Sequence, residues 1–389
     1  MSSMLELSAP LVQGNEWKYV KDCLDTNWVS SAGKYVNLLE EKICAATGAH
    51  VGVACISGTA ALQVALQVVG VEAKDEVLVP TVTFIAPINA VKYLQAEPVF
   101  MDCDDFYNID VEKTLEFLET QTIYRKGFTY NKKTKRRISC IVPVHVFGNA
   151  ANLEKLVPKC KERNIKIVED ATESLGSYYL NGTFKGRHTG TLGDVGCYSF
   201  NGNKIVTTGG GGMLVTNDVK WGKQARYLTT QAKDDELHSI HNEIGYNFRL
   251  SNIQAALGIA QMECLGKFIE AKSINYARYK REIDCIKGLR MAPVPDYAKN
   301  NYWMYAVQVD KRAYGISRDI LLNQLRKKGI EVRPLWYLNH MQKPYRDAQS
   351  YRIENAYRLR EITMNIPCGT GLSDDDIERV VEELQTCQK

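Results

Sequence analysis

The chain has 389 residues, of which 45% are hydrophobic and 24% charged, and its formal net charge is +4. This composition excludes a disordered chain and lacks the strong basic bias of a dedicated nucleic-acid binder. No run approaches the ~20 apolar residues of a membrane span, and residues 1–10 do not resemble a secretory signal. The eleven cysteines are scattered and form no Cys-x-x-Cys pair, as is typical of reduced thiols. We therefore expect a cytoplasmic protein of enzyme size, with no nucleic-acid partner, no membrane partner and no metal site.

Over the first 255 residues, short β-branched apolar runs alternate with helical patterns. Residues 60–69, closed by Gly70, and residues 152–163 are expected helices. The apolar runs lack the alternation of a half-exposed strand, which predicts a mostly parallel sheet with helices on both faces. The expected strands are residues 51–56, 76–79, 98–102, 138–144, 165–170, 195–200 and 212–216.

A long helical pattern runs from Ser251 to about Lys287, and the chain restarts after Gly288 with mixed signals. A strand is expected at residues 303–309, and helices are expected at 318–328 and 374–384. We predict a large α/β domain over residues 1–255. A linking helix and a small C-terminal α+β domain would occupy residues 256–389.

Residues 132–137 carry five positive charges in six positions. A run of this kind is typical of a solvated hairpin or loop tip. A patch for phosphate or nucleic acid is the alternative.

A turn of small residues, Ser57-Gly58-Thr59-Ala60, lies between an expected strand and an expected helix. The free N–H groups and the positive dipole end of a helix start suit a phosphate. The same residues are equally explained as a helix cap without a ligand.

Two further segments place reactive groups at strand ends. Asp170 ends a buried strand, where a carboxylate can hold a cationic ring nitrogen or simply cap the next helix. Lys204 follows another strand in a turn of small polar residues, before the glycines at 209–212. An amine in a desolvated site forms Schiff bases with carbonyl compounds, although most lysines are solvated surface charges.

A polar segment at residues 245–252 could serve phosphates or cap the long helix.

In this order, these segments resemble the DegT/DnrJ/StrS family of nucleotide-sugar aminotransferases, over essentially the whole chain. The resemblance implies pyridoxal 5′-phosphate (PLP) as cofactor and an α/β fold of the aspartate-aminotransferase type (fold type I). It is closest to the members of the bacillosamine and legionaminic acid pathways, which act on UDP-4-keto-6-deoxy-N-acetylhexosamines. The resemblance to the family as a whole is carried by residues 57–62, 169–171 and Arg333-Pro334-Leu335-Trp336. The resemblance to these particular members is carried by Trp28-Val29-Ser30-Ser31 and residues 199–204 and 228–232.

The resemblance implies that Lys204 binds the cofactor covalently and shuttles the reacting proton, which a released neutral amine can do. Asp170 would pair with the ring nitrogen of the cofactor. Phe84 would cover one face of the ring, although an ordinary core aromatic is the alternative. Glu173 stands where many members have Gln near the cofactor hydroxyl. The implied phosphate-site residues are Gly58, Thr59, Ala60, Ser199 and, from the partner subunit of a homodimer with shared active sites, Asn247.

The substrate contacts that the resemblance implies come from three segments. Arg249 of the partner subunit suits a pyrophosphate, and aromatic faces can stack on a base or a sugar. For Trp336 and His340, interdomain packing is the alternative. The loop residues are Asn27, Trp28, Val29 and Ser30.

We therefore expect an enzyme that moves an amino group from L-glutamate to carbon 4 of a UDP-4-keto-6-deoxy-N-acetylhexosamine, for bacterial surface-glycan synthesis. Relatives with His in place of the lysine deoxygenate sugars instead, so Lys204 favours transamination. The same chemistry on a GDP- or dTDP-linked 4-keto or 3-keto sugar, as in perosamine synthesis, is the alternative. A non-catalytic regulator that binds PLP or a nucleotide is disfavoured by the intact Lys204, Asp170 and Ser199.

Overall fold

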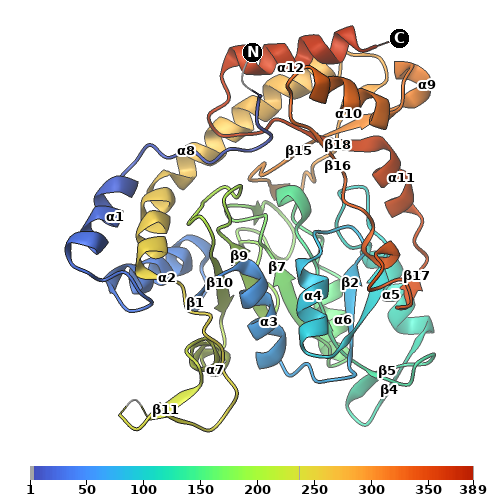
Figure 1. Ribbon diagram of the computed structural model, residues 1–389. Helices are drawn as coiled ribbons and strands as arrows, with labels where there is room; N and C mark the ends of the chain where they lie inside the picture. The colour runs from blue at the N-terminus through green and yellow to red at the C-terminus, as the bar shows by residue number, and fades with distance from the viewer. Residues whose placement is uncertain (1–3, 236, 389) are drawn as a thin grey trace.

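The protein, seen in a computed structural model that describes residues 4–235 and 237–388, is built around one large sheet and one small sheet (Figure 1). The large sheet has the strand order β1-β10-β9-β7-β6-β2-β3-β17. Neighbours from β9 to β17 along this path are parallel, whereas β10 is antiparallel to both β1 and β9. The strands are β1 (Val51–Cys55), β2 (Glu76–Pro80), β3 (Glu97–Met101), β6 (Arg137–Ile141), β7 (Lys166–Asp170), β9 (Val195–Ser199), β10 (Gly212–Thr216) and β17 (Ser350–Tyr351).

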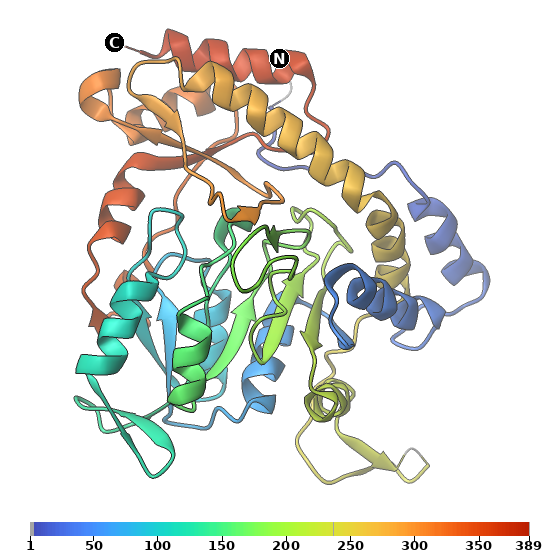
Figure 2. The ribbon, with the colours of Figure 1, turned by 180° about the vertical axis from the view of Figure 1, so that it is seen from behind.

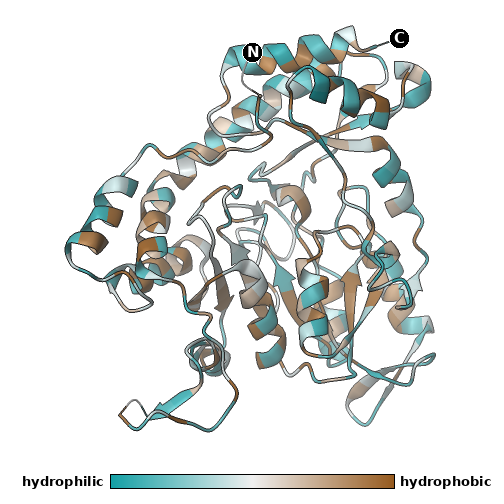
Figure 3. Ribbon diagram, in the orientation of Figure 1, coloured by the Kyte–Doolittle hydropathy of each residue, from teal (hydrophilic) through white to brown (hydrophobic). Residues whose placement is uncertain are grey.

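Alternate residues of these strands are buried on opposite faces, which explains why the strands read as continuous apolar runs. Val77 and Val79 of β2 join the core beneath α3 and α4, whereas Leu78 joins the core beneath α5 and α6. Figure 3 shows brown segments in the strands of the large sheet and on the helices around it. The helices around the sheet are α1 (Glu16–Asp25), α2 (Lys34–Thr47), α3 (Gly58–Val68), α4 (Ala86–Tyr93), α5 (Val111–Thr120), α6 (Leu156–Glu162) and α7 (Val219–Thr229).

Two hairpins extend from the large sheet. The first is formed by β4 (Thr122–Arg125) and β5 (Phe128–Asn131), and β5 pairs with the start of β6. The second is the two-stranded sheet of β11 (Lys233–Asp235) and β12 (Ile240–His241), which projects away from the body near α7 (Figures 1 and 2). The small pair β8 (Tyr178–Tyr179) and β14 (Ala298–Lys299) is also antiparallel.

The long helix α8 (Asn252–Ile283) leads from the large sheet to the small one (Figure 2). Its start is fixed by a capping box in which Ser251 and Gln254 satisfy each other's backbone N–H groups. The small sheet has the order β13-β15-β18-β16 and its own apolar core. The strands and helices of this part are β13 (Leu289–Met291), β15 (Tyr305–Val309), β16 (Arg333–Pro334), β18 (Thr363–Ile366), α9 (Lys311–Tyr314), α10 (Arg318–Lys327), α11 (Asn355–Ile362) and α12 (Asp374–Thr386). Short 3-10 turns lie at Val146–Gly148, after β6 of the large sheet, and at Asn339–Met341.

The expected fold class is confirmed: this is an α/β chain with a mostly parallel central sheet. One expected helix is too long, because α6 begins at Leu156 rather than at residue 152. Pro158 lies in the first turn of α6, and a proline is tolerated there but not deeper inside a helix. The division near residue 255 stays a prediction. The structure adds that the first described residues lie beside the small sheet, since Leu5 forms an isolated bridge with Ile330, three residues before β16.

Candidate active site

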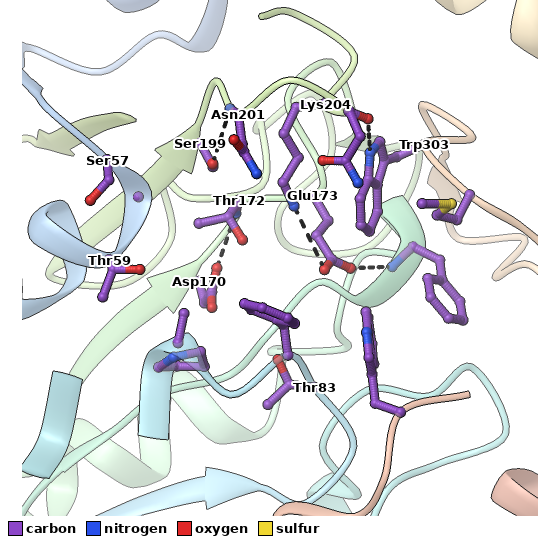
Figure 4. Close-up of a pocket in the computed structure, with 18 of the residues that line it drawn as sticks. Ser57, Thr59, Thr83, Asp170, Thr172, Glu173, Ser199, Asn201, Lys204 and Trp303 are labelled. Atoms are coloured by element: carbon purple, nitrogen blue, oxygen red, sulfur yellow. Dashed lines mark hydrogen bonds and ion pairs between the residues drawn. The ribbon is translucent and has the colours of Figure 1, made fainter. Parts of the chain in front are cut away.

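A cavity of about 430 Å³ lies where the carboxyl ends of β7 and β9 face the small sheet (Figure 4). Ligands of open parallel sheets collect at this edge, because the strand-to-helix turns leave polar groups free there. The start of α3 and the turn after β9 form one part of the wall. Trp303, Arg333 and Asn365 from the small sheet and its approach form another, and Leu7 joins them.

The start of α3 forms a cradle of backbone N–H groups. Ser57 caps the helix, and its Oγ accepts a hydrogen bond from the Ala60 N–H at 3.1 Å. Gly58 and Thr59 line the cavity with first-turn N–H groups that have no acceptor within the helix. A Cβ at position 58 would lie 2.9 Å from Ser199 Cβ, so only glycine lets α3 approach β9 this closely. The cradle therefore suits an anion beside the Ser199 hydroxyl.

Asp170, the last residue of β7, provides a buried carboxylate in the wall of the cavity. One of its oxygens accepts a hydrogen bond from the Thr172 N–H at 3.1 Å. Burial raises the pKa of Asp170, because water is removed from the charged form. Among the described residues, no side chain forms an ion pair with Asp170. A cationic group bound in the cavity would supply one.

Lys204 brings an amine into the same cavity. Its Nζ lies 3.8 Å from Glu173 Oε1 and 3.9 Å from the ring centre of Trp303. The Lys204 side chain is 13% exposed, and burial lowers its pKa. Burial also raises the pKa of Glu173 to about 7. Both shifts favour the neutral forms, and a neutral amine is the form that attacks a carbonyl carbon.

The backbone holds Glu173 in place. Its Oε2 accepts a hydrogen bond from the Phe147 N–H at 2.9 Å. Phe147 has a φ of 57°, in the left-handed region that bulky residues rarely adopt. Such outliers gather at functional sites, where the surrounding structure enforces them.

The structure brings together half of the residues that the sequence singled out. They all line the cavity and come from segments up to 278 positions apart, since the first is Gly58 and the last Trp336. They are Gly58, Thr59, Phe84, Asp170, Glu173, Ser199, Lys204 and Trp336. Ala60 lies next to them, but its N–H is used by Ser57 and it does not line the cavity.

The other expected contacts lie away from the cavity of this chain. Asn247 is exposed and pairs with Thr230. Arg249 forms a buried ion pair with Glu40. Asn27, Trp28, Val29 and Ser30 form an exposed loop between α1 and α2.

His340 has hydrogen-bond partners on both ring nitrogens. Its Nδ1 lies 2.7 Å from Thr81 Oγ1, and its Nε2 lies 2.8 Å from the Tyr357 hydroxyl. In this chain it packs between segments of the two sheets, and its role in substrate binding stays a prediction.

Several residues of the cavity were missed by the sequence analysis. Thr172 bonds to Asp170, Trp303 covers Lys204, and Arg333 brings a positive charge to the cavity wall. Thr172 could have been found, because it follows the strand-ending acid by two positions. The pairing of Trp303 with a lysine 99 positions earlier has no local signal.

Comparison with known proteins supports one family. The model of the DegT/DnrJ/EryC1/StrS aminotransferase family matches residues 10–385. The chain is 34% identical to the putative pyridoxal phosphate-dependent aminotransferase EpsN of Bacillus subtilis, covering 99% of this chain and 96% of that protein. It is 33% identical to the GDP-perosamine synthase of Caulobacter vibrioides, covering 98% and 97%. Among solved structures, DesI in the presence of its TDP-sugar product has a TM-score of 0.87 at 26% identity, covering 100% and 93%.

The cavity fits PLP on the evidence of its own residues. An anionic phosphate needs the N–H groups at the start of α3, a cationic ring nitrogen needs the unpaired carboxylate of Asp170, and an aldehyde needs the amine of Lys204. All three groups line one cavity. With this fit and the match over residues 10–385, the chain belongs to the DegT/DnrJ/EryC1/StrS aminotransferase family, and it is a PLP-dependent aminotransferase.

Proposed function

We propose that this enzyme transfers an amino group from L-glutamate to the keto carbon 4 of a nucleotide-linked 4-keto-6-deoxy sugar. The observation that carries the proposal is a lysine, Lys204, in one cavity with the buried acid Asp170. A lysine can bind the cofactor and later move a proton, so it supports transamination. The relatives support a sugar as the acceptor, because three of them are named GDP-perosamine synthase.

Bound PLP supplies an electron sink that makes the hydrogen on the amino-bearing carbon acidic. Lys204 Nζ would take this proton and return it, and burial lowers its pKa, which favours the neutral amine that this role needs. Asp170 would hold the ring nitrogen of the bound cofactor in its cationic form. Glu173, 3.8 Å from Lys204 Nζ, can hold a proton that the lysine gives up. Trp303 and Trp336 keep water away from this region.

The nucleotide has two candidates. A UDP-linked N-acetylhexosamine is our first choice, on the resemblance of residues 28–31, 199–204 and 228–232. A GDP-linked sugar is the second, because the identity of 33% to a GDP-perosamine synthase extends over nearly the whole chain. Formation of surface-glycan precursors in the cytoplasm follows from either candidate as a prediction.

We also propose that the active unit is a homodimer. The β11–β12 hairpin projects away from the body (Figures 1 and 2). Leu237, between its strands, is 86% exposed, and Ile244, three residues after β12, is 85% exposed. Large apolar side chains this exposed on a projecting segment favour a surface that another chain covers. Asn247 lies three residues beyond Ile244, so a partner that covers this hairpin would lie close to it.

The deciding experiment is the visible absorption spectrum of the purified enzyme. Glutamate should bleach the yellow colour of the lysine-bound cofactor, and the colour should return with a UDP-4-keto-6-deoxy-N-acetylhexosamine. Return only with GDP-4-keto-6-deoxymannose would assign the second candidate. Bleaching without return on either sugar would contradict the proposed acceptor. Absence of the colour after added PLP would contradict the role of Lys204.

A further inference from the structure

The hairpin of β4 and β5, with the turn that leads into β6, is strongly basic. Residues 122–137, which we call the basic hairpin, contain seven Lys or Arg and no Asp or Glu. Figure 1 shows it at the end of the large sheet that lies farthest from α12 and the small sheet. Nothing in the aminotransferase chemistry uses this segment, since the cavity lies at the other end of the same strands.

Most of these cations have no carboxylate beside them. Arg137 is bound to Asp75, and Arg136 lies 3.8 Å from Glu97. The remaining five form no ion pair with any side chain that the structure describes. They are Arg125, Lys126, Lys132, Lys133 and Lys135. All five are exposed.

The basic hairpin also exposes apolar side chains. Ile123 is 47% exposed, Tyr124 is 46% and Phe128 is 39%. The register pairs Ile123 with Tyr130 and Arg125 with Phe128, so these four side chains share one face of the hairpin. The guanidinium of Arg125 lies 4.8 Å from the ring centre of Tyr130. Charged and apolar groups therefore alternate on this face.

Both turns of the basic hairpin are held in defined conformations. Lys126 and Gly127 have φ values of 50° and 83°, which suit a tight two-residue turn, and Asn164 Nδ2 donates to the Gly127 carbonyl at 2.8 Å. In the second turn, the Asn131 side chain accepts from the Lys133 N–H at 2.9 Å. The cations therefore sit on a preformed support, which lowers the entropy cost of binding.

We propose that the basic hairpin docks the enzyme on the surface of an anionic phospholipid membrane. Lysines near an anionic bilayer gain from its negative surface potential, and aromatic and aliphatic side chains enter the headgroup region. The feature is a protruding edge rather than a groove, so it fits a flat surface better than a nucleic-acid strand. Neutral membranes and proteins without acidic surfaces do not match its charge.

This proposal departs from the expectation of no membrane partner, but it concerns attachment to the surface and needs no spanning segment. In the part of the chain that the structure describes, no helix is long and apolar enough to cross a bilayer. Because the cavity lies at the opposite ends of the strands, a docked enzyme keeps its active site open to substrate. A membrane-bound acceptor of an activated amino sugar would then receive the product from a nearby source.

The test is co-sedimentation of the PLP-loaded enzyme with vesicles. We expect binding to phosphatidylcholine vesicles that contain phosphatidylglycerol, much weaker binding to phosphatidylcholine alone, and release at high salt. Reversal of four lysines should weaken binding by at least about 10³-fold and leave aminotransferase turnover unchanged. The four substitutions are Lys126→Glu, Lys132→Glu, Lys133→Glu and Lys135→Glu.

A matched control reverses four exposed lysines elsewhere, with the same change in net charge. It should bind anionic vesicles within about threefold of wild type, because these lysines lie outside the basic hairpin. The substitutions are Lys185→Glu, Lys220→Glu, Lys287→Glu and Lys311→Glu. If charge reversal in the hairpin prevents folding, glutamine at the same four positions gives the same comparison.

Three outcomes would overturn the proposal. If the wild-type enzyme binds vesicles equally with and without phosphatidylglycerol, it has no such membrane-docking surface. An equal loss of vesicle binding in the hairpin variant and in the control variant would show that only the net charge of the enzyme matters. An RNA oligonucleotide that displaces the enzyme from vesicles and binds it more tightly would assign the surface to nucleic acid instead.

Discussion

The indole ring of Trp303 lies against the amine of Lys204, with Nζ 3.9 Å from the ring centre. Two hydrogen bonds fix the ring in this position. Trp303 Nε1 donates to the Asn203 carbonyl at 2.8 Å, directly before the lysine. The buried Lys272 Nζ donates to the Trp303 carbonyl at 3.2 Å. A residue just before β15 of the small sheet therefore covers the reactive lysine, which follows β9 of the large sheet.

Replacing Trp303 should therefore misplace Lys204. We expect Trp303→Leu to lower kcat/KM by up to about 100-fold, because a small displacement of the amine moves it out of line with the reacting carbon. Trp303→Phe keeps an aromatic face and should lose less. Steady-state kinetics over a pH series measures both effects, because the ring also influences the lysine pKa. Equal losses in the two variants would show that the hydrogen bond to Asn203 matters and the ring does not.

Removal of the amine should abolish transamination. Lys204→Ala is expected to lose at least about 10³-fold in kcat, since a positioned general base alone contributes up to about 10⁴-fold. PLP should still bind through the α3 cradle and Asp170, which fluorescence titration can measure. Turnover near the wild-type rate would contradict the mechanism. Loss of both PLP binding and the thermal unfolding transition would instead indicate a folding defect.

Glu173 gives the protein a pH-dependent stability. Its pKa in the folded protein is raised to about 7, whereas an unfolded Glu titrates near 4.3. The neutral form is therefore favoured in the folded state, and this stabilisation is complete below about pH 4.3 and is lost as the pH rises through about 7. Relative to Glu173→Gln, the free energy of unfolding of the cofactor-free wild type should fall by about 3 kcal/mol over that range. Urea unfolding at several pH values measures it, and parallel curves would contradict the shift.

Substitution of Gly58 tests the close contact between α3 and β9. In Gly58→Ala the new Cβ would meet Ser199 Cβ at 2.9 Å and Thr172 Cγ2 at 3.2 Å. We expect a loss of about 1–3 kcal/mol in stability and weaker PLP binding, because the cradle must move. Gly266→Ala in α8 is the control, since a Cβ there meets nothing within 4 Å. It should stabilise the helix by up to about 1 kcal/mol. Similar behaviour of both variants would show that α3 adjusts freely.

Local sequence signals located the segments in which one stretch makes both the element and the chemical group, whereas the roles of these groups came from the family resemblance. The strand that ends at Asp170 and the turn that carries Lys204 are of this kind, because a run of apolar residues followed by a polar one locates a strand end. The start of α3 was predicted for the same reason. These three segments already define the core of the candidate site.

Contacts between residues far apart in the sequence could not be predicted from local sequence patterns. Trp303 was expected inside a strand, but β15 begins at Tyr305 and leaves Trp303 free to reach Lys204. The position of Arg249 against Glu40 depends on the packing of α2 beside β1. The α1–α2 loop and Asn247 are exposed in the single chain, and their expected contacts stay predictions.

The cavity wall also explains why this active site cannot be isolated as a fragment. Leu7, the residues between Ser57 and Gly211, and the residues between Trp303 and Asn365 all contribute to it. The Cys368 N–H donates to the Leu7 carbonyl at 2.7 Å, which ties the first of these stretches to the last. A cut after α8 would leave each half with an incomplete wall. Activity recovered by mixing two such halves would thus measure reassembly of the whole architecture, rather than folding of either piece.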